Sequence, residues 1–93
     1  MKTNVHKNSL NGYADLIKSG LLSKQQTKVV KVLYYTSNVT REEIARLAEI
    51  KEASVCGRIR ELIDDDIVVA VGTKKTISGK TADTLSLADN FKH

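Results

Sequence analysis

The side chains best suited to binding chemistry lie close together in one short stretch of the sequence. Arg58 is the first candidate, because an arginine fork can pair with both O6 and N7 of a guanine base. Ser54 is a candidate for a base edge or a phosphate, and Arg60 for a phosphate or an ion pair within the protein. The alternative is a solvated helix face on which Glu61 neutralises Arg58. The pattern favours contact with DNA.

Gly57 lies in the middle of the same expected helix face, where a glycine costs about 1 kcal/mol relative to alanine. A functional reason for it is that the helix backbone must come very close to another surface, and the small neighbours Ala53 and Ser54 support this. The alternative is that Gly57 is an indifferent surface residue or packs under a neighbouring hairpin.

A second basic element is the nine-residue stretch 72–80, which holds Lys74, Lys75 and Lys80 and no acid. Such a positive loop suits a phosphate backbone or a minor groove. The alternative is a hairpin turn that its lysines protect from edge-to-edge aggregation. Thr40 and Arg41 begin another helix, and the free amides of a helix N-terminus can also bind phosphate.

The sequence gives little support for a catalytic or metal-binding site. His6 and His93 lie in expected tails, so neither is held against a nucleophile. The sequence has no glycine-rich phosphate-binding motif and no metal-ligand set, so we expect no enzyme activity, no cofactor and no metal. Cys56, the single cysteine, excludes an internal disulfide and is expected to be a small core filler.

Two helices are expected before these elements. The first runs from about Leu10 to Ser19, capped by Ser9 and ended by Gly20, with one apolar side formed by Leu10, Ala14 and Ile17. The second runs from Lys24 to about Thr36 and is capped by Ser23. Its expected buried stripe is Val29, Val30, Leu33 and Ser37, with Lys24, Lys28 and Lys31 opposite. Val39 then forms a short bridging strand.

Two further helices should position the binding residues. Thr40 and Glu43 have the spacing of a capping box. The helix that they open lasts about two turns, and its expected buried residues are Ile44, Leu47 and Ala48. After a turn at Ile50, a longer helix at 53–65 should bury Val55, Ile59, Leu62 and Ile63. A strand at 67–71, the loop 72–80 and a strand at 81–87 follow.

A short helix, a tight turn, a longer helix and a hairpin together form a winged helix-turn-helix. We therefore predict a mainly α fold with a small β-hairpin (α+β), with three to four helices plus the wing. The stretches beginning at Thr40 and Ala53, with the wing from Gly72 to Lys80, resemble small phage and prophage winged-helix proteins. They are more loosely similar to regulators of the multiple-antibiotic-resistance type. Glu49 stands where such turns usually have glycine.

The chain of 93 residues is expected to form one domain at 9–88, with a disordered tail at 1–8 and a frayed end at 89–93. No signal peptide and no apolar stretch long enough to cross a membrane is present, so a cytoplasmic protein is expected. Tyr34 and Tyr35 are expected to fill the core, with a subunit interface as the alternative.

Charge is unevenly distributed along the chain. The net charge is +4, but residues 1–31 carry +5, residues 41–66 carry −3 and residues 67–93 carry +2. The leading hypothesis is a double-stranded DNA-binding protein, a phage or prophage transcriptional regulator that dimerises through its N-terminal helix and Tyr35 region. The acidic middle, including Asp64–Asp66, motivates an alternative: a protein-interaction module of the same fold that binds a host replication or transcription protein.

Overall fold

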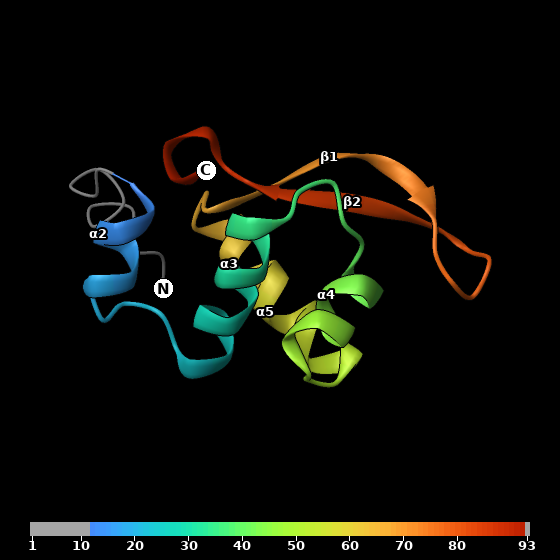
Figure 1. Ribbon diagram of the computed structural model, residues 1–93, viewed down its shortest axis with the longest axis horizontal. Helices are drawn as coiled ribbons and strands as arrows, with labels where there is room; N and C mark the ends of the chain where they lie inside the picture. The colour runs from blue at the N-terminus through green and yellow to red at the C-terminus, as the bar shows by residue number, and fades with distance from the viewer. Residues whose placement is uncertain (1–11, 93) are drawn as a thin grey trace.

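The computed structural model describes residues 12–92, so the predictions for Ser9, Leu10, the 1–8 tail and His93 lie outside the described residues. Figure 1 shows α3, α4 and α5 grouped against one side of a β-hairpin that projects beyond them. This is the predicted α+β winged helix-turn-helix. Its elements are α2 (Tyr13–Lys18), α3 (Lys24–Tyr35), α4 (Arg41–Ala48), α5 (Glu52–Asp64), β1 (Val68–Lys75), β2 (Thr81–Leu87) and the 3-10 helix η1 (Asp89–Phe91).

Helix α2 is shorter than its predicted range, and it buries Leu16. Ala14, predicted to face inward, is exposed, so the expected apolar side was wrong at that position. Gly20 has φ +75° and ends the segment as expected, because glycine has no Cβ to clash in the left-handed region.

Helix α3 begins at a capping box in which the Ser23 hydroxyl accepts from the Gln26 amide at 3.1 Å. Val29, Val30 and Leu33 are buried as predicted, whereas Ser37 lies beyond the end of α3 and is exposed, so its place in the expected stripe was wrong. The tyrosines at its end separate: Tyr34 stacks on Tyr13 with ring centroids 3.7 Å apart, whereas Tyr35 is 74% exposed. Core filling was therefore the wrong prediction for Tyr35, because two residues after Leu33 the helix has turned by about 200° and Tyr35 points away from the side that Leu33 buries.

Helix α4 begins with the predicted capping box, because the Thr40 amide donates to Glu43 Oε1 at 2.9 Å and the Glu43 amide donates to Thr40 Oγ1 at 3.3 Å. Ile44 is buried, but Leu47 is 56% exposed, which corrects its prediction as a core residue. Leu47 lies only about 60° around the helix from Ile44, so its exposure means that no other described element covers this end of α4.

The turn between α4 and α5 passes through Glu49, whose φ of 59° lies in the left-handed region. A non-glycine residue there costs on the order of 1 kcal/mol, which is the consequence of the missing glycine noted in the sequence. Val55, Ile59 and Leu62 of α5 are buried, and Ile63 is half-buried. Cys56 is exposed, so its prediction as a core filler was wrong.

Strands β1 and β2 pair antiparallel from Val68↔Leu87 to Lys75↔Thr81, with an irregularity between Ala70 and Gly72. Leu85 also forms the predicted bridge with Val39. The hairpin is longer than predicted, since β1 continues to Lys75. Lys74 and Lys75 therefore lie on a strand and not in a loop, and the turn is confined to residues 76–80.

The chain end folds back onto the domain. Phe91 is 1% exposed and belongs to the same core as Leu16, and η1 contacts α2. The predicted fraying beyond residue 88 is therefore wrong at Phe91. Within residues 12–92, no helix is both long and apolar enough to cross a membrane.

Candidate nucleic-acid interface

The outer face of α5 is defined by the side that it buries. Ala53, Gly57 and Arg60 follow one another at spacings of four and three residues, opposite Val55 and Ile59. Ala53 and Arg60 are exposed, and a Cβ added at Gly57 would meet no atom within 4 Å. Gly57 therefore does not pack under the wing, and α5 presents a shallow face that another surface can approach closely.

Arg58 lies to one side of that face and joins α5 to α3. Its Nη1 donates to Gln25 Oε1 at 3.1 Å and its Nη2 donates to Glu61 Oε2 at 3.1 Å. Glu61 Oε1 lies 2.9 Å from Arg58 Nε and accepts from Gln26 Nε2 at 2.8 Å. The pairing with Glu61 is the one that the alternative interpretation expected, so Arg58 must exchange these partners before it can bind a base. Ser54, on the same side of α5, is half-buried.

Two glutamates at the start of α4 hold the wing. Glu42 Oε1 accepts from the Ile77 amide at 2.8 Å, and Glu42 Oε2 accepts from the Ser78 hydroxyl at 3.2 Å. Glu43 Oε1 lies 3.0 Å from Lys74 Nζ. The wing is thereby fixed against the helix-turn-helix. Sequence reasoning found Glu43 only as a cap and missed Glu42, because partners 35 residues apart leave no local pattern.

Glu43 is the charged group at this junction whose pKa is shifted. The hydrogen bond from the Thr40 amide lowers its pKa, and the hydrogen bond and charge of Lys74 lower it further. Partial burial opposes both effects. The carboxylate is therefore held in its ionised form, which suits a group that caps a helix and pairs with a lysine.

These contacts occupy the polar groups of Thr40 at the N-terminus of α4. Thr40 is fully buried, and its amide and hydroxyl both bond to Glu43. Arg41 is half-buried. Of the predicted wing lysines, Lys74 is paired with Glu43, whereas Lys75 and Lys80 are exposed. The structure thus brings Lys74, Lys75 and Lys80 together on the wing but separates them from Arg58, which bonds toward α3.

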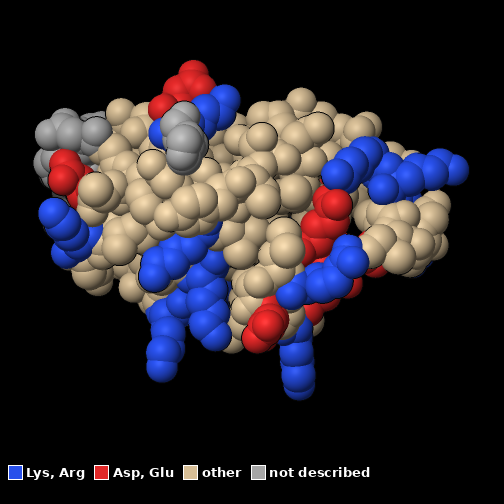
Figure 2. Space-filling view, in the orientation of Figure 1, with Lys and Arg blue, Asp and Glu red and all other residues tan. Residues whose placement is uncertain are grey.

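Figure 2 shows how the charges lie on one face of the molecule. Basic side chains gather along the wing and along the edge below α3, and acidic side chains lie between the wing and α4. The acidic middle of the sequence is therefore used partly inside the protein, where Glu42 and Glu43 face the wing and Glu61 faces Arg58.

The solved structures that resemble this chain include two from Listeria. One is a multiple antibiotic-resistance repressor (MarR) from Listeria monocytogenes 4b F2365, with TM-score 0.63 and 26% identity, matched over 92% of this chain and 56% of that one. The other is a protein with unknown function from Listeria innocua Clip11262, with TM-score 0.60 and 19% identity, matched over 78% of this chain and 48% of that one.

The chain spans about half the length of these two proteins. No protein-family model matches it, and a search of curated proteins also gives no match. The chain has a winged helix-turn-helix fold, and it resembles a repressor of the multiple-antibiotic-resistance type, as the looser of the two sequence resemblances indicated.

Proposed function

We propose that the protein binds double-stranded DNA and regulates transcription. The observation that carries the proposal is the shared winged-helix fold with a multiple antibiotic-resistance repressor over 92% of this chain. The shallow outer face of α5 supports it, because a helix without bulk at Ala53 and Gly57 can lie deep in a major groove.

The roles divide between the two elements. In this proposal α5 enters the major groove with Gly57 nearest the bases, Arg60 and Ser54 beside it, and Arg58 freed from Gln25 on binding. Lys75 and Lys80 bind phosphates from the wing. Arg41, at the start of α4, adds a phosphate contact beside the wing. Lys74 joins them if a phosphate displaces Glu43. Thr40 is left out, because its polar hydrogens are used within the capping box.

The biological setting is also a proposal. The sequence resemblance to small phage and prophage winged-helix proteins supports a DNA site in a phage or prophage control region, and hence action in the cytoplasm. A symmetric site would require a homodimer, because each copy reads one half-site. Sedimentation of the free protein and of its complex with duplex DNA measures this directly.

The test is a titration of fluorescent duplex DNA followed by anisotropy at several salt concentrations. We expect binding at low salt that weakens as salt rises, because lysine contacts release ions condensed on the phosphates. The double variant Lys75→Ala/Lys80→Ala should make the slope of log K against log salt shallower by about 1.8, or about 0.9 for each lost phosphate contact.

The matched control is Lys24→Ala/Lys28→Ala, which removes the same charge from exposed positions on α3. It should change the slope little. Absence of binding at low salt, or an equal loss in both double variants, contradicts the proposal.

A further inference from the structure

Helices α3 and α4 leave an apolar groove uncovered between the end of one and the end of the other. The groove has a volume of about 300 Å³ and is lined by Lys31, Val32, Tyr35, Thr36 and Leu47. Tyr35 is 74% exposed and Leu47 is 56% exposed. We call this surface the Tyr35 groove. Large apolar side chains exposed side by side mark a surface that binds something.

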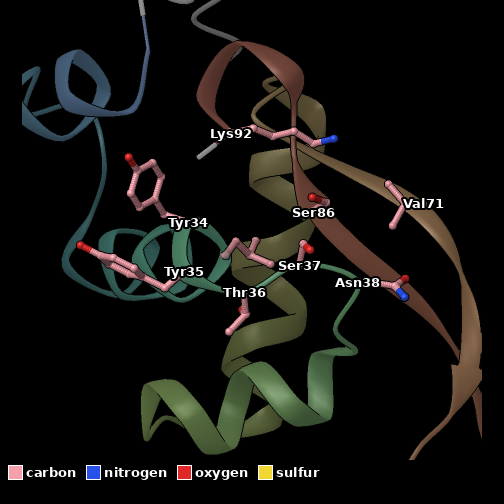
Figure 3. Close-up of a pocket in the computed structure, with 9 residues that line it drawn as sticks. Tyr34, Tyr35, Thr36, Ser37, Asn38, Val71, Ser86 and Lys92 are labelled. Atoms are coloured by element: carbon pink, nitrogen blue, oxygen red, sulfur yellow. The ribbon is translucent and has the colours of Figure 1, made fainter.

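A second hollow adjoins the Tyr35 groove and shares Tyr35 and Thr36 with it. Its volume is about 530 Å³, and Figure 3 shows it between the end of α3 and the hairpin, with Val71 and Lys92 across from Tyr34 and Tyr35. Val71 is 49% exposed. The two hollows share Tyr35 and Thr36, and tyrosine is a residue type enriched among the residues that dominate binding energy at interfaces.

The charged side chains that line this surface are lysines. Among the described residues that line either hollow, the charged ones are Lys31 and Lys92, and no carboxylate is included. Lys92 pairs with Asp89, whose side chain is exposed. Glu42 and Glu43 of the neighbouring α4 are engaged with the wing. An occupant should therefore be apolar where it meets Tyr35 and Leu47 and acidic where it meets Lys31.

Charge and polarity argue against the two other occupants. A DNA backbone offers phosphates, and apolar tyrosine and leucine surface gives them no partner. In a two-fold contact centred on the groove, the two copies of Lys31 would lie close together, and no carboxylate lines the groove to separate them. We propose that the Tyr35 groove docks an acidic amphipathic helix of another protein, in the helix-in-groove manner.

The proposal fits the position of the groove between two helices. A helix presents apolar residues at spacings of three and four on one stripe, and such a stripe fills a groove between two helices. Glutamates next to that stripe would reach Lys31 at the edge. The contact is independent of the proposed DNA interface, because it uses neither the outer face of α5 nor the lysines of the wing.

The experiment uses the full chain and two labelled helical peptides with the same leucine stripe. One peptide carries glutamates beside the stripe and the other carries lysines at those positions. We expect the glutamate peptide to bind more tightly by at least about tenfold, and to shift amide NMR signals of Val32, Tyr35 and Leu47 in the isotope-labelled protein. Equal affinity of the two peptides, no binding of either, or shifts confined to other elements overturns the proposal.

Variants locate the contact. Tyr35→Gln/Leu47→Gln should weaken the glutamate peptide about tenfold or more, because the anchoring apolar area is lost, and Lys31→Glu should weaken it about fivefold. All three positions are exposed, so the fold should be retained. Ile77→Gln, a 68% exposed apolar residue on the wing, is the control and should have no effect. If Tyr35→Gln/Leu47→Gln instead abolishes a dimer seen by sedimentation, the occupant is a second copy and the proposal is wrong.

Discussion

A single carboxylate, Glu43, makes three contacts that connect the start of α4 to the wing. It caps α4 through the Thr40 amide, accepts from the Thr40 hydroxyl, and pairs with Lys74 of the wing. Each of these contacts favours the ionised form, and together they lower the pKa of Glu43 in the fold. Because unfolding releases the carboxylate into water, the stability of the domain is linked to its ionisation.

We expect this linkage to appear in acid. The unfolded chain binds a proton at Glu43 before the folded chain does, so the contribution of Glu43 is complete above its ordinary pKa. It is lost as the pH falls through the lowered value in the fold. Urea denaturation at about pH 7 and about pH 3 measures the free energy of unfolding. Wild type should lose more of it than Glu43→Gln does, since glutamine cannot titrate.

Glu52→Gln is the matched control, because Glu52 is an exposed glutamate in the first turn of α5. It should keep the acid sensitivity of the wild type. An acid-induced loss in Glu43→Gln as large as that of wild type would contradict the role given to Glu43.

At the scale of elements, the sequence predicts the features that depend on residues close together in the chain. The caps at Ser23 and Thr40 and the buried stripe of α5 are local patterns, and the structure confirms them. Leu47 is apolar at a position that periodicity assigns to the interior, yet no other described element covers it, whereas Tyr35 lies on the side of α3 opposite Leu33. Burial depends on what packs against a helix end, and spacing within one helix does not contain that information.

The candidate interface was harder to predict than the fold. The sequence identifies Arg58 and the wing lysines by residue type, but their partners are distant. Gln25 is 33 residues from Arg58, and Glu42 is 35 residues from Ile77. Such pairs form only after α3, α5 and the hairpin have packed. Helical spacing predicts Gly57 on the outer face of α5, but only the packed structure shows that nothing covers it there.

Helix α5 offers a test in which stability and binding should move in opposite directions. Gly57→Ala adds a methyl group that meets no atom within 4 Å, so the free energy of unfolding should rise by about 1 kcal/mol. If the backbone at Gly57 lies against DNA, the same methyl group should weaken duplex binding by about tenfold or more, equivalent to about 1.4 kcal/mol.

Cys56→Ala is the control for that experiment, because Cys56 is exposed on α5 beside the Gly57 face. It should leave duplex affinity unchanged. Gly57→Ala with raised stability and unchanged affinity would mean that nothing approaches closely at this position.

At the scale of the whole molecule, the first and last elements of the described chain both contribute residues to the core. Leu16 of α2 and Phe91 of η1 are both fully buried in one cluster with residues of α3, α5 and β2. A domain of this size buries a modest share of its surface, so each large buried side chain is a substantial part of its stability. Residues 89–91 therefore have a structural role, although the residues around Phe91 are polar.

This role predicts a large loss from a change near the end of the chain. Phe91→Ala should lower the free energy of unfolding by about 3–5 kcal/mol, a major fraction of the roughly 5–15 kcal/mol typical of a domain. Truncation after Ala88 should cost about the same, because it removes the same anchor. Asp89→Ala, which removes only an exposed ion pair with Lys92, should change stability by less than about 1 kcal/mol. Urea denaturation of the three variants measures their free energies of unfolding. A loss in Phe91→Ala no larger than that in Asp89→Ala would mean that Phe91 does not hold the end of the chain in the core.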